Sequence, residues 1–149
     1  MRLEEAIKQK EFTDSYNKAI VNLHYTQSYL VTKQSCLFKP FGLSPEQYNV
    51  LRILRGQKGS PITVSSIQDR MLNKMSNASR LVEKLKQKGM VVREECPTDR
   101  RQVDILITEK GMDVLSQLHN QMHELNRTLV QLNGEEVDQL NDLLDKLRG

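Results

Sequence analysis

Aromatic residues and cysteines are scarce in this chain of 149 residues. Trp is absent, and Phe and Tyr together account for 5% of the sequence. The two cysteines, Cys36 and Cys96, are 60 positions apart. They form neither a disulfide framework nor a CxxC pair. A fold held together by disulfides is therefore excluded.

Long apolar runs are also absent. No segment approaches the roughly 18 to 20 apolar residues that a membrane-spanning helix needs. Residues 1 to 12 carry charges where a signal peptide would be apolar. We therefore expect a soluble, helix-rich cytoplasmic protein with no membrane partner. Its length predicts one domain, residues 1-149, that is large enough to bury a core.

The sequence motifs of the common enzyme classes are missing too. There is no nucleotide-binding glycine loop, no HExxH metal motif and no nucleophile elbow. The three histidines are too few, and too distant from Cys36 in sequence, to indicate a catalytic pair. We therefore expect neither an enzyme nor a cofactor.

Positive charge is concentrated in the middle of the chain. The net charge is only +3, but residues 52–110 hold 13 Lys and Arg against 7 Asp and Glu. The remaining residues hold 9 against 12, so the two ends are acidic. A basic middle segment suits a polyanionic partner, and a solvated basic face without a partner is the alternative.

Periodic apolar residues predict one long first helix over about residues 3 to 34. They recur at spacings of three, four and seven, at Phe12, Tyr16, Ala19, Ile20, Leu23 and Leu30. A second helix is predicted over residues 45 to about 55. Ser44 is its expected N-cap, and Gln47 stands at the capping-box position.

Residues 63 to 108 predict two short helices followed by a two-stranded hairpin. Thr63 can cap the first helix, and Gly89 ends the second. The strands are expected at 90–95 and 102–108 because the second of them alternates apolar and polar residues. This order of elements is typical of a winged helix. The predicted fold is therefore mainly α, an α+β winged helix-turn-helix with a two-stranded wing.

A coiled-coil spacing marks the C-terminal third of the chain. Intervals of three and four separate Leu115, Leu118, Met122, Leu125, Leu129 and Leu132, and the spacing resumes at Val137, Leu140, Leu144 and Leu147. Asn133 and Glu136 form a capping-box pattern between the two helices. Such a stripe also forms when helices pack within one chain.

A small winged helix does not need additional helices at both ends. We therefore favour dimerisation helices in residues 1-35 and 112-149. The predicted dimer contacts are Phe12, Leu118, Met122, Leu125, Leu129, Leu140 and Leu144.

The second short helix carries short polar side chains and cations. If this helix lies in a major groove, its hydroxyl and amide groups can contact base edges, and its cations can contact phosphates. The predicted DNA contacts in this segment are Lys74, Ser76, Asn77, Ser79, Arg80 and Lys84. An ordinary amphipathic surface helix is the alternative.

The stretch CPTDRRQVDILITEKG, residues 96 to 111, places two adjacent arginines at the hairpin tip. An arginine at the tip of a wing can reach a minor groove, where the negative potential attracts it. A carboxylate beside it, here Asp99, can hold the cation in one pose before DNA arrives. Arg101 is the predicted groove contact and Arg100 a predicted phosphate contact. A solvated charged turn is the alternative.

The same stretch resembles the wing signature of the MarR family of bacterial transcriptional regulators. That signature has Asp-x-Arg, a strand, and Leu-Thr-x-x-Gly opening a long helix; the matching residues are Asp99, Arg101, Ile107, Thr108 and Gly111. Residues 62–94 are similar to the helix-turn-helix of the family, and the likeness extends over the whole chain. One departure is Leu72-Asn73, where relatives commonly have Gly followed by an apolar residue.

The resemblance implies a homodimeric regulator that binds double-stranded DNA at a near-palindromic operator. It implies that residues 45-110 form the DNA-binding part, and repression is the commoner mode in the family. Effectors of the family bind in the crevice between the dimerisation helices and the winged part. A winged helix that contacts only proteins is the alternative, but its recognition face would be apolar or acidic, whereas this one is basic and rich in serine.

Several residues are candidates for sensing an effector. Tyr16, Tyr25, Tyr29 and Tyr48 would suit a small aromatic effector, although core packing explains them equally well. Cys36 and Cys96 are candidates for sensing oxidants, with inert thiols as the alternative.

His119 and His123 stand four apart on one predicted helix, a spacing that lets two imidazoles share a metal ion. Zinc-responsive relatives use paired histidines there, but this pair is one residue out of register. The carboxylate and histidine expected on the second helix are Gln47 and Tyr48 in this chain. No metal is therefore assigned, and a metal- or redox-sensing variant of the regulator is the alternative.

Overall fold

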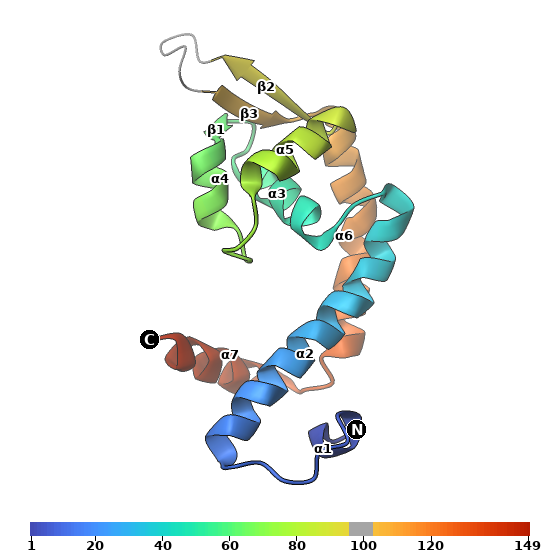
Figure 1. Cartoon of the computed structure of the whole chain (residues 1–149). Helices are drawn as coiled ribbons and strands as arrows, with labels where there is room; N and C mark the ends of the chain where they lie inside the picture. Colours follow the sequence, from blue (N-terminus) through green and yellow to red (C-terminus); the bar gives the residue numbers. More distant parts are fainter. Residues whose placement is uncertain (96–102) are drawn as a thin grey trace.

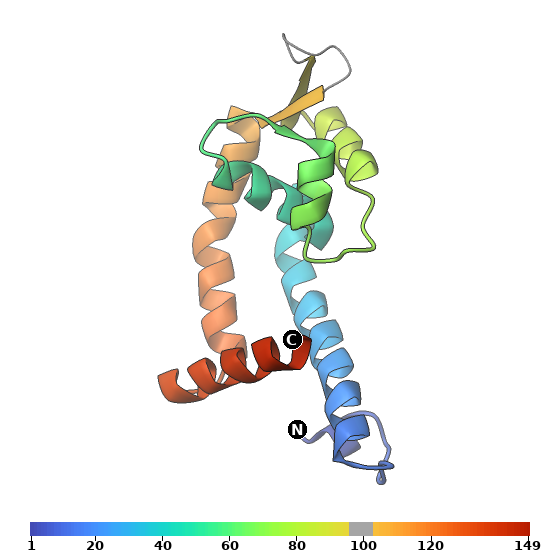
Figure 2. The same cartoon turned by 90° about the vertical axis from the view of Figure 1, so that its left-hand side faces the viewer.

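Two long helices form an arm that leads away from a winged part in the computed structural model, which describes residues 1–95 and 103–149 (Figure 1). The arm helices are α2 (Ser15–Phe38) and α6 (Glu109–Leu129), which contact each other. They run side by side in both views (Figures 1 and 2). The winged part comprises η1 (Lys39–Phe41), α3 (Pro45–Gly56), β1 (Ile62–Thr63), α4 (Val64–Arg70), α5 (Ala78–Gln87), β2 (Val91–Glu95) and β3 (Val103–Ile107). The shorter helices α1 (Leu3–Ala6) and α7 (Gly134–Arg148) flank the arm in sequence. Within the two described ranges, no helix is long and apolar enough to cross a membrane.

The wing rests on a three-stranded antiparallel sheet with the strand order β1-β3-β2. In its longer pair, Val91 of β2 faces Ile107 of β3, which confirms the two predicted wing strands. The third strand, β1, places Ile62 opposite Ile105 and was not predicted. Two residues are too few to show an alternating pattern. Together with the helices, this sheet confirms the predicted mainly α, winged helix-turn-helix fold.

Side-chain caps start the helices where the sequence predicts them. Ser44 Oγ accepts from Gln47 N at 3.2 Å, and Ser44 N donates to Gln47 Oε1 at 3.1 Å. Thr63 caps α4 through Ser66 N, and Asn133 forms the predicted capping box of α7. Each cap satisfies backbone groups that a helix end leaves without intrahelical partners.

The predicted single helix over residues 3 to 34 is wrong. The structure has the short helix α1, then a connection, then α2, which begins at Ser15 and continues to Phe38. Asp14 Oδ1 accepts from Asn17 N at 2.7 Å and thereby starts α2, because Asp is a strong N-cap. Lys18 of α2 donates to the Glu4 carboxylate, which holds the pKa of Glu4 below its usual value and ties α1 to the arm.

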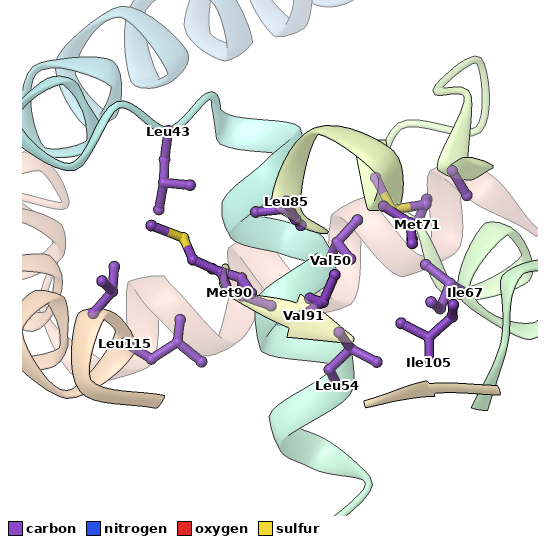
Figure 3. Packing of buried hydrophobic residues seen from close by; sticks show 14 of the residues in the cluster. Leu43, Val50, Leu54, Ile67, Met71, Leu85, Met90, Val91, Ile105 and Leu115 are labelled. Atoms are coloured by element: carbon purple, nitrogen blue, oxygen red, sulfur yellow. The ribbon is translucent and has the colours of Figure 1, made fainter. Parts of the chain in front are cut away.

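The apolar core lies where α3, α4, α5 and the sheet meet (Figure 3). Val50, Ile67, Leu85 and Ile105 have no exposed surface, and they come from four different elements. Phe38, at the end of α2, is 1% exposed and extends this core to the arm. Each side chain of this size contributes about 1.5–3 kcal/mol when it is buried.

Leu118 and Met122 of α6 belong to the same core. They are 0% and 8% exposed in the protomer. A side chain without accessible surface in one protomer cannot contact a second one. The dimer contact predicted for Leu118 is therefore replaced by a role in the core, and Met122 retains only a narrow exposed edge. Apolar spacing could not separate these roles, because a helix that packs within its own chain has the same period.

The last helix, α7, buries none of its residues. Leu140 is 41% exposed and Leu147 is 57% exposed. Because α6 ends at Leu129, Leu132 of the predicted stripe lies in the connection to α7 and not in a helix. The apolar face of α7 is thus left uncovered in the protomer.

Gly111 lies so close to its neighbours that no side chain fits there. A substitution at this position therefore tests the packing between the sheet and α6. A Cβ there would lie 2.5 Å from Met90 O and 2.7 Å from Ile107 Cγ1. We expect Gly111→Ala to lower the free energy of unfolding by about 1–3 kcal/mol, because overpacking outweighs the better helix propensity of Ala. Gly56→Ala is the control, since its Cβ would meet no atom within 4 Å. Urea denaturation measures both, and equal stability of the two variants would contradict the close packing.

Candidate nucleic-acid interface

Helix α5 is fixed at both ends by local hydrogen bonds. At its start, Asn77 Oδ1 accepts from Arg80 N at 2.9 Å. At its end, Gly89 adopts φ +71°, and Met90 N donates to Leu85 O at 3.0 Å. This is a Schellman motif, in which a left-handed glycine satisfies the last carbonyls of the helix. The predicted stop at Gly89 is confirmed.

One face of α5 packs into the core, and the opposite face is open to solvent. Val82 and Leu85 have no exposed surface. Ser79, Arg80 and Lys84 are exposed on the other side. The structure thus brings three of the predicted DNA contacts together on one outward-facing surface of a helix whose position is set by the core.

Ser76 and Asn77, two of the predicted DNA contacts, precede the first residue of α5. The side-chain oxygen of Asn77 is occupied by the cap. Ser76 Oγ is buried and has no hydrogen-bond partner among the described residues. Lys74, in the same turn, donates from Nζ to the carbonyl of Asp69 at 2.5 Å. Both Asn77 and Ser76 are therefore less available for base contacts than the exposed helix residues.

An open hollow of about 470 Å³ lies along one flank of α5. Its lining residues are Ser44, Glu46, Asn73, Ser76, Asn77, Arg80, Leu81 and Lys84. Two cations of α5 and one carboxylate of α3 border it, together with hydroxyl and amide groups. The flank therefore continues the polar, mainly basic character of the exposed face toward the N-terminus of α3.

The wing is linked to α5 by an ion pair. Arg93 Nη1 of β2 lies 3.4 Å from Glu83 Oε2 of α5. Both side chains are partly exposed, so this pair contributes little stability, on the order of 0–1 kcal/mol. The ends of β2 and β3 that lead to the wing tip lie on the same side of the winged part as the N-terminus of α5 (Figure 1). The predicted tip residues Cys96, Asp99, Arg100 and Arg101 lie outside the described residues, so their roles stay predictions.

A hydrogen-bonded junction at the C-terminal end of α5 was not foreseen from the sequence. Lys88 Nζ donates to Gln47 Oε1 at 3.0 Å and to the carbonyl of Gly42. On the other side, Lys110 Nζ donates to Lys88 O at 2.7 Å, and Thr108 Oγ1 donates to Gly89 O at 2.7 Å. The junction therefore connects α5 to the segment after α2 and to the start of α6. Gln47 was expected only as a capping residue, and nothing in the local pattern indicates its contact with a residue 41 positions away.

The four candidate tyrosines do not gather around one site in the protomer. Tyr16 is 83% exposed near the start of α2. Tyr48 stacks on Phe38 at the other end of that helix, with ring centroids 4.6 Å apart. Tyr16 and Phe38 are about 33 Å apart along the helix axis. Tyr16 and Tyr48 therefore cannot line the same small cavity of one protomer.

The candidate redox and metal residues stand apart from the α5 surface. Cys36 is exposed near the end of α2, where its Sγ lies 3.7 Å from the carbonyl of Thr32. His119 and His123 are exposed on α6. In residues 1–95 and 103–149, no three His, Cys, Asp or Glu side chains come together as metal ligands.

Comparisons with known proteins place this geometry among DNA-binding regulators. Residues 41–102 match the sequence model of the MarR family. The chain is 31% identical over 107 residues to the HTH-type transcriptional regulator MhqR of Bacillus subtilis (strain 168), a match that covers 71% of this chain and 72% of MhqR. It is 28% identical over 127 residues to the transcriptional repressor MprA of Escherichia coli (strain K12), covering 83% of this chain and 70% of MprA. The Staphylococcus aureus MepR–DNA complex aligns with a TM-score of 0.72 at 26% identity, covering 92% of this chain and 97% of MepR.

The junction at Lys88 can be tested without DNA. Lys88→Met keeps the aliphatic stem but removes the charged donor to Gln47 and Gly42. We expect it to lower the free energy of unfolding by about 1–3 kcal/mol, because the hydrogen bonds of one charged donor are lost. Lys86→Met is the matched control, because Lys86 is an exposed cation in the same helical turn. Urea denaturation that gives the same stability for both variants would show that the junction adds nothing to stability.

Proposed function

Because the chain belongs to the MarR family of transcriptional regulators, we propose that it represses transcription as a homodimer on a near-palindromic operator. The observation that carries this proposal is the exposed face of α5, where Ser79, Arg80 and Lys84 lie together. Such a surface offers hydrogen-bonding groups to base edges and cations to phosphates. The similarity to MprA, which is named a repressor, supports repression over activation.

The wing supplies a second contact in this proposal. Arg101 enters the minor groove next to the major groove that α5 occupies, and Asp99 holds its guanidinium in position. Arg100 contacts a phosphate. The support is the sequence of the tip and the contact of β2 with α5.

Dimerisation uses the apolar faces that the protomer leaves uncovered. Leu140 and Leu144 lie on α7, which buries none of its residues, and Phe12 is only half-buried before α2. Leu125 and Leu129 at the end of α6 are also half-buried and lie beyond the core. A surface that exposes several apolar side chains favours a protein partner. A second copy of the chain, related by two-fold symmetry, would cover this surface.

The proposed symmetry determines the form of the operator. Two α5 helices related by a two-fold axis read successive major grooves, about 34 Å apart, so the two half-sites are inverted repeats. The regulator acts on this DNA in the cytoplasm. A change in the angle between the arm and the winged part alters the separation of the two helices and thus the affinity.

A small aromatic effector is the signal that we propose for this change. Tyr25 and Tyr29 stand four residues apart on α2, so they share one side of the arm. Tyr48 and Phe38 stack where the arm joins the winged part. An aromatic effector bound near this stacked pair would contact the segment after α2, which Lys88 connects to α5.

The salt dependence of DNA binding tests the α5 surface. A duplex from the region upstream of the gene should bind with an affinity that falls steeply as salt rises, because phosphate contacts release counterions. Lys84→Ala should reduce the slope of log K against log salt by about one for each protomer. Lys146→Ala on α7 should leave the slope unchanged. The absence of binding at low salt would overturn the proposed function, and an unchanged slope in Lys84→Ala would remove this residue from the interface.

The dimer interface is tested by adding charge to the uncovered face of α7. Leu140→Glu with Leu144→Glu should convert the dimer to a folded monomer, because α7 contributes no buried residue to the protomer core. The control is Gln139→Glu with Lys146→Gln, which changes the net charge by the same amount through two exposed polar residues. Sedimentation velocity distinguishes the two states. A stable dimer of the first variant would show that α7 lies outside the interface.

A further inference from the structure

The turn that leads from α4 into α5 exposes two large apolar side chains. Leu72 is 87% exposed and Met75 is 92% exposed, whereas Met71 just before them is 1% exposed. Met71 therefore anchors the turn in the core, and the two later side chains contribute nothing to it. Their exposure has no explanation within the protomer.

Hydrogen bonds hold this turn in one conformation. Leu72 N donates to Asn49 Oδ1 at 2.9 Å, and Met75 N donates to Asn73 Oδ1 at 3.0 Å. Ser76 N donates to Asn73 O at 3.1 Å and closes a four-residue turn. Lys74 and Met75 occupy the two central positions of that turn, so their side chains project away from the backbone bend.

Gln68 of α4 connects this turn to the start of α5. Its Nε2 donates to Lys74 O at 3.3 Å, and its Oε1 accepts from Ala78 N at 2.9 Å. Met75 is therefore presented in a fixed position relative to the first turn of α5. Because the backbone at Met75 is held in advance, a contact made by Met75 costs side-chain rotamer freedom but little backbone freedom.

The surroundings of Met75 identify the partner. The side chain stands two residues before Asn77, the N-cap of α5, and next to Lys74. Arg80 and Lys84 are exposed on the helix that follows. The turn joins the end of α4 directly to the N-terminus of α5 (Figure 1). An apolar side chain within a basic surface that faces DNA meets one apolar group in the major groove, the 5-methyl group of thymine.

We propose that Met75 reads a thymine in each operator half-site by packing against its 5-methyl group, with Leu72 beside it on the same turn. This inference rests on the proposed DNA-binding function and adds a specificity-determining residue to it. The thioether side chain is unbranched and polarizable, so it fits against a methyl group without a hydrogen-bonding partner. The polar groups of Ser79 and Arg80 are left to contact base edges that carry donors and acceptors.

Replacement of thymine by deoxyuridine tests the proposal, because it removes the methyl group and keeps every hydrogen-bonding group. The duplex is one that the wild-type protein selects from the upstream region of the gene, and its thymines are replaced one at a time within one half-site. For one thymine we expect the Kd of the wild-type protein to rise about four-fold, the value expected for one methyl group. Met75→Ala should bind the thymine and deoxyuridine duplexes equally, and Met75→Leu should retain part of the difference.

Two controls separate this contact from other causes. Met112→Ala removes a partly exposed methionine on α6 and should keep the full four-fold difference. Met75→Ala should keep the wild-type slope of affinity against salt, because it removes no cation. Its thermal unfolding midpoint should also stay unchanged, since the side chain is not part of the core.

The outcomes distinguish this inference from the proposed function. If the wild-type protein binds its duplex but no deoxyuridine replacement weakens binding, or if Met75→Ala keeps the difference, the inference is overturned and the DNA-binding function stands. If Met75→Ala instead dissociates the dimer in sedimentation, the side chain belongs to a protein interface and the inference is also overturned. If no duplex binds at low salt, the proposed function itself fails.

Discussion

The position of α5, which carries the proposed DNA-binding surface, depends on the hydrogen-bonded junction at its C-terminal end. Lys88 Nζ contacts Gln47 and Gly42, and Lys110 Nζ contacts the carbonyl of Lys88. The first contacts join α5 to the segment that follows α2, and the last joins it to α6. Because the segment after α2 and the start of α6 both contact α5 at this point, we propose that a movement of the arm shifts this helix. In the proposed dimer, this transmission lets an effector in the arm change the distance between two DNA-reading helices.

The apolar residues of the arm divide between two tasks. Leu115 and Leu118 of α6 are at most 1% exposed and complete the core of the protomer. Farther along the chain, Leu140 of α7 stays 41% exposed. The division follows from position along the chain, because α6 packs against α2 and α3, whereas α7 buries none of its residues. The protomer is thus stable at one end and leaves an uncovered apolar surface at the other, which is the arrangement that a dimer requires.

The surface assigned to DNA combines a fixed helix with a fixed turn. The Schellman motif at Gly89 and the cap at Asn77 determine where α5 begins and ends. Gln68 then links the turn to the helix, so that Met75 and Arg80 are presented as parts of one rigid unit. In the proposed complex, the polar groups that contact base edges and the apolar group that contacts a thymine methyl then keep fixed relative positions along the groove.

The sequence by itself determined the elements whose signals are local. The caps at Ser44, Thr63 and Asn133, the stop at Gly89 and the two wing strands depend on neighbouring residues, so the chain could be read for them directly. The break before α2 was missed because helical periodicity outweighed the cap at Asp14 in the prediction.

Only the tertiary structure decided which apolar residues are covered and which long-range polar contacts form. Leu118 and Leu140 share one spacing, but one is fully buried and the other is exposed. Gln47 meets Lys88 across 41 positions. Met75, which carries no sequence signal of its own, becomes significant only because it is exposed in a fixed turn. The reason in each case is physical: burial and contact depend on what lies across space, and a period along the chain does not contain that information.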